Sequence, residues 1–290
     1  MKIKCKLTDS TEYKQFCCME NSVYTLKINK NYEYWYYDLC DLIDFYKSNN
    51  SIKVILDVEK ADIITARKLY SSHTYNEKCL REYESKFMVH STPIKNLESI
   101  LNDGALKSWN ILKSEKANWE QDPIGTLLGD IDDFSDYVML SAPFQNNEII
   151  IASKQKHKID TDINQIYQPG ARFYLDAQML ADDGLLLRDG EHIKVKNYIP
   201  LDKYLIWYST TEKLDLSKNQ PLRNFLKCQT INFLHYIHNT NRKLFFNRGN
   251  LEVKLWKRRF YRQVNMTLHL QVKSLQGADW LHSLPKRYTA

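Results

Sequence analysis

The chain has 290 residues and a formal net charge of +6, with 43% hydrophobic and 26% charged residues. This composition is that of a globular protein with a sizeable core, and it excludes a disordered chain. The first residues lack the apolar run of a signal peptide, and nowhere do ~18 consecutive apolar residues form a membrane helix. We therefore expect a soluble, cytoplasmic protein with no membrane partner.

The cysteines and histidines do not predict a metal site. The cysteines form no CxxC pair and show no clustering with histidine at metal-ligand spacing, which favours reduced thiols and no bound metal. They are Cys5, Cys17, Cys18, Cys40, Cys79 and Cys228. His235 and His238 stand three apart on a predicted helix, but no third ligand lies nearby, so we interpret them as helix-surface residues. A Rossmann dehydrogenase and a P-loop NTPase are unsupported because the chain lacks GxGxxG and Walker loops.

Residues 1–85 are expected to form an N-terminal α/β addition. The alternating tyrosines at 32, 34 and 36 predict a strand, and the apolar spacing of residues 39–46 predicts a helix after it. Ile52 to Val58 reads as a further strand, and Ala61 to Tyr70 as a helix. This segment contains no group of residues suited to chemistry, so we interpret its many aromatic side chains as packing.

The stretch FMVHSTPIKNLESILNDGAL, residues 87–106, has a site-like pattern. Its apolar start predicts a short strand that ends at His90-Ser91. Thr92 is a natural helix N-cap and Pro93 a natural first helical residue, while Gly104 suits the left-handed residue that ends the helix. His90 would then lie beside a helix start, where anionic ligands are favoured. The alternative is a structural histidine at a strand end.

The remainder of the central region, residues 86–210, alternates short strands and loops. Residues 109–122 predict a polar, partly helical lid, and residues 125–144 run from a loop into an apolar strand. The aspartates at 130, 132 and 133 lack the later ligands of a calcium loop. Further strands are expected at residues 149–152, 172–175 and 185–187. Asp189-Gly190 then predicts a tight turn, and Glu191 is expected to open the next strand.

Three ordered stretches resemble the ADP-ribosyltransferase superfamily, most closely the DarT-like group that modifies DNA bases. They are VHST…NL..IL..GAL, DFSDYVMLSAPF and GEHIKVKNYIPLDKYLIW, and together they cover about two-fifths of the chain. The resemblance implies an α+β fold in which a split antiparallel sheet forms a catalytic core at residues 86–210, with N-terminal and C-terminal additions. Two departures, Ser91-Thr92 directly after His90 and Asp189-Gly190 before Glu191, leave the acceptor open.

The resemblance also implies a chemistry in which NAD is the co-substrate and nicotinamide the leaving group. Glu191 is the expected catalytic carboxylate, because it would stabilise positive charge that grows on the ribose. The expected NAD-binding residues are His90 on a ribose hydroxyl, Ser91 or Thr92 orienting the ligand, Tyr137 stacking on nicotinamide, and Arg172 and Arg188 pairing with the pyrophosphate. For each arginine, the alternative is an exposed surface residue.

Residues 211–290 are expected to form a basic, aromatic C-terminal addition. Residues 221–238 predict an amphipathic helix, and Arg242 to Arg262 interleaves basic and aromatic side chains in a manner suited to nucleic acid. The alternative for the latter stretch is a solvated helix or hairpin. The overall prediction is a toxin or defence effector with an antitoxin or immunity partner, its oligomeric state left open. The rival is a non-enzymatic nucleic-acid-binding protein with a degenerate core.

Overall fold

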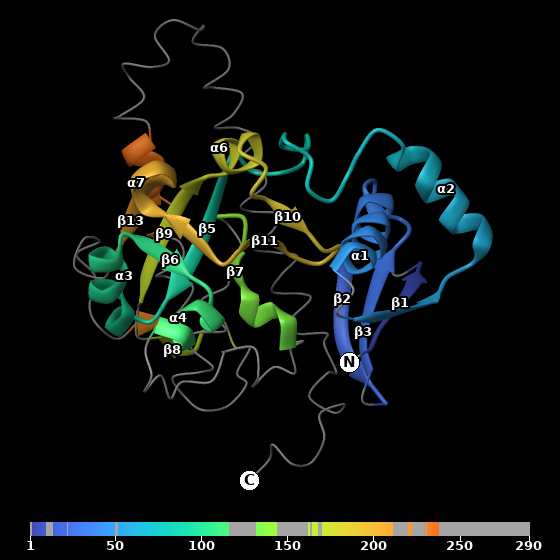
Figure 1. The fold of residues 1–290 in the computed structure, drawn as a ribbon, viewed down its shortest axis with the longest axis horizontal. Coiled ribbons are helices and arrows are strands. Elements are labelled where there is room, and N and C mark those ends of the chain that lie inside the picture. Colours follow the sequence, from blue (N-terminus) through green and yellow to red (C-terminus); the bar gives the residue numbers. More distant parts are fainter. Residues whose placement is uncertain are drawn as a thin grey trace, which may run out of the picture.

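The structure is a computed structural model, and it is a mixed α+β fold built from several small sheets (Figure 1). It describes residues 2–9, 14–21, 23–49, 52–115, 132–143, 162, 164–167, 170–210, 220–221, 229 and 231–237. The predicted strand at residues 149–152, the cysteine at 228, the histidine at 238 and the basic stretch 242–262 lie outside these residues. Within the described helices, none has the length and apolar character needed to cross a membrane.

The N-terminal part is a four-stranded sheet in the strand order β2-β3-β1-β4, with helix α1 packed against the sheet and helix α2 packed against α1. Strands β3 and β4 run parallel to the central strand β1, and β2 is antiparallel to β3. The elements are β1 (Lys2–Thr8), β2 (Gln15–Glu20), β3 (Val23–Asn29), α1 (Trp35–Asn49), β4 (Lys53–Asp57) and α2 (Lys60–Tyr70). The predictions of β4, α2 and the helical part of α1 are thus confirmed.

The predicted strand at residues 32–36 is wrong. The backbone N–H of Tyr32 donates to the carbonyl of Asn29 at 3.2 Å, so the chain turns there, and helix α1 begins at Trp35. The tyrosines form a ring cluster instead, in which Tyr34 stacks on Tyr83 with centroids 4.5 Å apart. Alternating aromatic residues therefore reflected packing at a turn and not a strand.

Two three-stranded antiparallel sheets form the central part, in the orders β13-β9-β5 and β10-β11-β7. They meet where Val89 of β5 and Ser141, next to β7, form an antiparallel bridge. The strands are β5 (Phe87–Thr92), β7 (Tyr137–Leu140), β9 (Ala171–Asp176), β10 (Leu187–Arg188), β11 (Ile193–Lys196) and β13 (Leu205–Ser209). The antiparallel bridge continues the pairing from one sheet into the other.

Short elements surround these sheets and complete the central core. They are η1 (Ile94–Asn96), α3 (Leu97–Asp103), β6 (Ala105–Lys107), α4 (Trp109–Glu115), η3 (Asp132–Asp136), β8 (Ile166–Tyr167), α6 (Ala177–Asp182), β12 (Tyr198–Pro200), α7 (Leu201–Tyr204) and β14 (Gln220–Pro221). A core cluster of fully buried side chains, among them Phe173, Leu175 and Leu180, fills the space between the sheets and α6.

Several local predictions in the central part need correction. His90 lies inside β5, which extends to Thr92, and Pro93 precedes a 3-10 turn, so Thr92 does not cap a helix. Gly104 does end α3 with a left-handed φ of 63°, as predicted. Leu185 is not in a strand, because its N–H donates to the carbonyl of Leu180 at the exit of α6.

The predicted C-terminal helix begins later than residue 221. Gln220 and Pro221 pair with β8 as strand β14, and residues 231–237 are helical. Phe233 of this helix stacks on Tyr174 of β9 with ring centroids 4.0 Å apart, and it is 1% exposed. The segment after β13 therefore packs on the central sheet over part of its length.

The N-terminal part and the central part share one core. The cluster that contains Cys5, Leu26 and Phe45 also contains Phe134 and Tyr137 from around β7. In Figure 1, hairpin β10–β11 reaches across from the central sheets to α1 and the N-terminal sheet. Residues 1–85 are therefore packed into the structure through apolar contacts and not only joined to it by a linker.

Candidate functional site

The turn between β10 and β11 is organised by the carboxylate of Asp189. One oxygen accepts the backbone N–H groups of Glu191 and His192 at 2.9 and 2.7 Å, and the other accepts the ammonium of Lys194 at 2.5 Å. Since these N–H groups are taken by a side chain, strand pairing starts only at Ile193. The prediction that Glu191 opens the strand is therefore off by two residues, and Glu191 lies in the turn.

Gly190 seats this turn against helix α1. Its φ of +89° is a left-handed conformation that other residues rarely adopt. A Cβ at this position would also clash with the backbone oxygen of Asp38 and lie 2.9 Å from the Cβ of Leu42. Only glycine allows the turn to approach the helix this closely, so the position of Glu191 depends on α1.

Lys194 is a fully buried lysine that anchors the turn from beneath. Its ammonium lies 4.1 Å from the ring centroid of Phe45, and the rings of Phe134 and Tyr137 follow at 4.7 and 4.5 Å. Burial alone would raise the pKa of Asp189, but the charges of Lys194 and His192 hold that pKa well below its usual range. A paired charge inside an aromatic box favours one conformation of the turn.

The carboxylate of Glu191 projects from the turn onto the N-terminal sheet. Its Oε2 accepts the hydroxyl of Tyr24 at 2.5 Å, and its Oε1 lies 3.4 Å from Nε2 of His192. Its backbone carbonyl accepts the side-chain amide of Gln15 at 3.2 Å. The Glu191 side chain keeps 17% of its surface exposed, so it is covered on the sheet side and reachable from outside.

The charge of Glu191 raises the pKa values of its neighbours. Burial, and then the charge of Glu191, raise the pKa values of the Cys17 thiol and the Tyr24 hydroxyl well above their usual values, so both groups keep their protons. Burial opposes protonation of His192, but the charges of Glu191 and Asp189 outweigh it and raise its pKa to about 9. The turn therefore holds an imidazolium beside a carboxylate at neutral pH.

His90 is held in a defined tautomer by strand β7. Its Nδ1 is 3.0 Å from the carbonyl oxygen of Met139, and since a carbonyl only accepts, Nδ1 carries the proton. Burial lowers the pKa of His90 below its usual value, which keeps the ring neutral. The remaining ring nitrogen, Nε2, is then a hydrogen-bond acceptor suited to a hydroxyl group.

His90 and Glu191 lie on opposite sides of β7. The antiparallel bridge between Val89 and Ser141 aligns His90 with Leu140, and Leu140 pairs with Ile193 of β11. With strands spaced about 4.8 Å apart, the backbones of His90 and Ile193 are roughly 10 Å apart. Strands β5 and β11, about a hundred positions apart in sequence, thus flank β7, while the shared site of His90 and Glu191 stays a prediction.

The other predicted binding residues have partners within the protein. The Thr92 hydroxyl accepts the side-chain amide of Asn96 at 2.9 Å and is buried, whereas Ser91 is half-buried beside it. Tyr137 lies in the core against Phe45, with ring centroids 5.9 Å apart. A buried ring enclosed by Phe45 and Lys194 offers no face to nicotinamide, so the expected stacking by Tyr137 does not fit this position.

The two arginines predicted for pyrophosphate binding are neither surface residues nor open to a ligand. Arg188 is 2% exposed and forms a two-pronged ion pair with Glu84 at 2.5 and 2.6 Å. Arg172 is 1% exposed and donates to the carbonyl of Pro143. Both the binding role and the surface alternative are corrected: these guanidinium groups hold backbone segments and acidic side chains in place.

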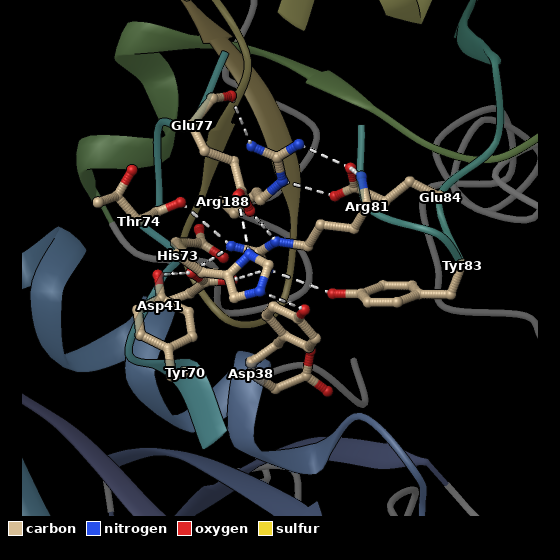
Figure 2. A network of polar contacts seen from close by, with 12 residues as sticks. Asp38, Asp41, Tyr70, His73, Thr74, Glu77, Arg81, Tyr83, Glu84 and Arg188 are labelled. Carbon is tan, nitrogen blue, oxygen red and sulfur yellow. Dashed lines mark hydrogen bonds and ion pairs between the residues drawn. The ribbon is translucent and has the colours of Figure 1, made fainter. Parts of the chain in front are cut away.

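Figure 2 shows a buried polar network that sequence reasoning missed. Arg81 donates to both oxygens of Asp41 in α1, at 2.5 and 2.9 Å, and also to Glu77. The ring of His73 bridges Glu77 and the hydroxyl of Tyr37, at 2.9 Å on each side. From the sequence, residues 71–86 were assigned no element and no role; the i,i+4 pair of Glu77 and Arg81 was the available signal.

This network fixes the approach to the candidate site. Glu84 holds Arg188, which directly precedes Asp189, and Arg188 also receives support from the carbonyl of Cys79 at 3.0 Å. The N–H of Arg188 donates to the carbonyl of Tyr75 at 3.0 Å. The loop of residues 71–86 therefore ties α1 to β10 and sets where the Glu191 turn begins.

The arrangement offers acid–base and electrostatic chemistry based on a carboxylate. In the part of the chain that the structure describes, no three His, Cys, Asp or Glu side chains gather as a metal site. The five described cysteines are free thiols. Comparison with protein-family models, curated proteins and solved structures found no match to this chain.

Proposed function

We propose that this protein is an NAD-dependent ADP-ribosyltransferase that releases nicotinamide. The observation that carries the proposal is the placement of Glu191, in the turn before β11, and His90, on β5, on either side of β7. Two three-stranded antiparallel sheets that meet at one bridge also fit the split sheet expected from the sequence resemblance. The sheet arrangement and the placement of the two motif residues both support this proposal.

The proposed chemistry uses Glu191 for charge stabilisation. Cleavage of the bond between ribose and nicotinamide develops positive charge on the sugar, and a carboxylate held nearby lowers the energy of that state. The same carboxylate can accept a proton from the incoming nucleophile. Because Glu191 sits in a turn locked by Asp189 and Gly190, its backbone needs no rearrangement during the reaction.

His90 would bind the NAD ribose as a hydrogen-bond acceptor. Its Nδ1 proton is committed to the Met139 carbonyl, which leaves the Nε2 lone pair for a ribose hydroxyl. A neutral ring is the form this requires, and burial favours that form. Ser91, half-buried on the same strand, is the second candidate for orienting the ligand, while Thr92 supports it from within the fold.

The acceptor we propose is single-stranded nucleic acid, modified in the cytoplasm by a toxin or defence effector with an antitoxin or immunity partner. Its support is the basic, aromatic stretch Arg242 to Arg262, in which charges suit phosphates and rings suit unpaired bases. One observation favours the rival, a non-enzymatic nucleic-acid-binding protein: Glu191 is largely covered by Tyr24 of the N-terminal sheet.

The experiment incubates the full chain with NAD and a single-stranded oligonucleotide. Nicotinamide is quantified by chromatography, and the oligonucleotide and other acceptors are analysed by intact mass. We expect nicotinamide release and a mass increase that corresponds to ADP-ribose. A matched variant replaces Lys257, Arg258 and Arg259 by Gln; it should lose labelling and flatten the salt dependence of binding while retaining slow NAD hydrolysis.

The outcomes separate the two functions. An oligonucleotide that binds equally well when Glu191 is replaced, with NAD never consumed, identifies the non-enzymatic binding protein. If the protein consumes NAD but neither binds nor labels any oligonucleotide, the transferase proposal stands and nucleic acid is excluded as the acceptor. Protein and small-molecule acceptors are then tested next.

A further inference from the structure

The contact between Tyr24 and Glu191 joins the N-terminal sheet to the candidate catalytic turn. Tyr24 is the second residue of β3, and it pairs with Ile3 of β1 on one side and Met19 of β2 on the other. It is 6% exposed, and its ring makes an edge contact with Phe134 at a centroid distance of 6.5 Å. A hydroxyl carried by a ring fixed in this way has little freedom of position.

The Tyr24 hydroxyl can only act as a donor toward the carboxylate. Burial and the charge of Glu191 raise its pKa well above the usual value, so the proton stays on the phenol. At 2.5 Å the bond to Oε2 is short and charge-assisted, the stronger kind of hydrogen bond. The amide of Gln15, from β2, holds the backbone of the same residue at 3.2 Å.

A glutamate side chain at a turn otherwise samples several rotamers. Ordering it costs free energy, and misplacement of a reacting group by a fraction of an ångström slows a reaction steeply. Asp189 fixes the backbone of Glu191 but does not contact its carboxylate. The side chain therefore needs a separate support, and Tyr24 supplies it on the oxygen that faces the sheet.

We infer that Tyr24 is a positioning residue for Glu191, so that the N-terminal sheet is an integral wall of the catalytic site. This inference rests on the proposed function. Tyr24 does not touch the reacting atoms; its hydroxyl holds Oε2 and leaves Oε1 turned toward His192. Residues 1–85 therefore contribute to catalysis although they contain no catalytic residue of their own.

The test compares Tyr24→Phe with a matched control, Tyr70→Phe. Tyr70 is also buried, also lies in the N-terminal part, and also donates to a carboxylate at 2.5 Å, but its acceptor is Asp41. Each variant removes one hydroxyl and keeps the ring. We expect Tyr24→Phe to lower kcat for nicotinamide release by about 10-fold to 100-fold, with KM for NAD within about twofold, while Tyr70→Phe retains kcat.

A second measurement does not depend on activity. With selectively labelled glutamate, the side-chain coupling constants of Glu191 are measured by NMR in wild type and in both variants. We expect one rotamer in wild type and in Tyr70→Phe, and averaged values in Tyr24→Phe. In the Glu191→Gln background, the further change Tyr24→Phe should alter residual turnover by less than about twofold, since its effect acts through the carboxylate.

The results separate this inference from the proposed function. Wild-type turnover and an unchanged rotamer in Tyr24→Phe overturn the inference, as does an equal loss of turnover in the two tyrosine variants, which indicates a general structural effect. If wild type never consumes NAD, the proposed transferase function falls. If the single Glu191 rotamer is nevertheless lost only in Tyr24→Phe, the inference that Tyr24 positions Glu191 stands. If neither activity nor the rotamer effect is seen, both proposals fall.

Discussion

The Arg81 network and the Glu191 turn are two polar regions that both join the N-terminal part to the central part. They differ in how exposed their charged side chains are and in which groups contact them. Arg81 and Asp41 have side chains that are 1% and 2% exposed, and each charge meets an opposite one. Glu191 keeps 17% of its side chain exposed, and a neutral hydroxyl covers one oxygen. Enclosed, matched charges suit architecture, whereas a partly exposed carboxylate with directed support suits chemistry.

The same contrast explains why the predicted arginine sites failed. Arg188 stands next to the Glu191 turn in sequence, and phosphate recognition by arginine made it a reasonable candidate. Its guanidinium belongs to the enclosed region, where two of its nitrogen atoms donate hydrogen bonds to the carboxylate of Glu84. Neighbourhood in sequence therefore does not decide which of the two regions a charged side chain serves.

Breaking the enclosed region should have the largest effect on stability. Replacing Arg81 by Met keeps most of the length but leaves Asp41 buried without its guanidinium, and we expect a loss of about 3–5 kcal/mol in unfolding free energy. Arg67→Met is the control, because its ion pair with Asp44 is 38% and 30% exposed, and should cost less than about 1 kcal/mol. Urea unfolding measures both; equal losses would contradict the contrast.

Displacing the Glu191 turn should come next. Gly190→Ala adds a Cβ that clashes with the Asp38 backbone at a φ of +89°, so we expect a loss of about 2–3 kcal/mol together with reduced turnover. Gly104→Ala is the matched control. It also has a positive φ, of +63°, but nothing lies within 4 Å of the added atom. It should cost about 1 kcal/mol. If Gly190→Ala keeps wild-type stability and turnover, close packing against α1 does not support the turn.

The His192 imidazolium predicts a pH dependence confined to the Glu191 region. Its pKa is raised from 6.5 to about 9 in the folded protein, so its contribution is fully present below pH 6.5 and is lost as pH rises toward 9. Between these values wild type should lose about 3 kcal/mol relative to His192→Gln, since each pKa unit corresponds to about 1.4 kcal/mol. Denaturant titrations of both proteins at several pH values check this; parallel curves would show that His192 is not charged.

The smallest change in stability is expected at His90. His90→Ala should weaken NAD binding by about tenfold, because it removes the nitrogen that accepts a hydrogen bond from a ribose hydroxyl. The unfolding midpoint should stay within a few degrees. His235→Ala, an exposed position on the helix of residues 231–237, should alter neither quantity. Calorimetric titration with NAD and a thermal scan decide the case. A variant that unfolds and becomes insoluble would instead make His90 structural.

Much of the local structure was predictable from patterns that one segment carries by itself. The apolar spacing of α1, the short strand β4 and the left-handed Gly104 are of this kind. The outcome for residues 32–36 differed because alternating aromatics served contacts with Tyr83, which is distant in sequence. Local periodicity cannot represent such a partner.

For the candidate site, the sequence offered residues but not the side chains that support them, for a similar reason. Glu191 and His90 could be chosen from their motifs and do lie on either side of β7. Tyr24 carried no signal, since its role depends on the meeting of β3 with a turn that comes 167 residues later in the chain. Supports that come from another part of the fold become visible only when the chain is seen in three dimensions.

Nicotinamide release from NAD by wild type and by Glu191→Gln tests the central claim most directly. The substitution keeps the size and the hydrogen-bonding capacity of the side chain but removes the charge that the proposed reaction requires. We predict measurable release by wild type and a turnover lower by roughly two to four orders of magnitude in Glu191→Gln. Equal rates for the two proteins would contradict the account and remove Glu191 from the catalytic role.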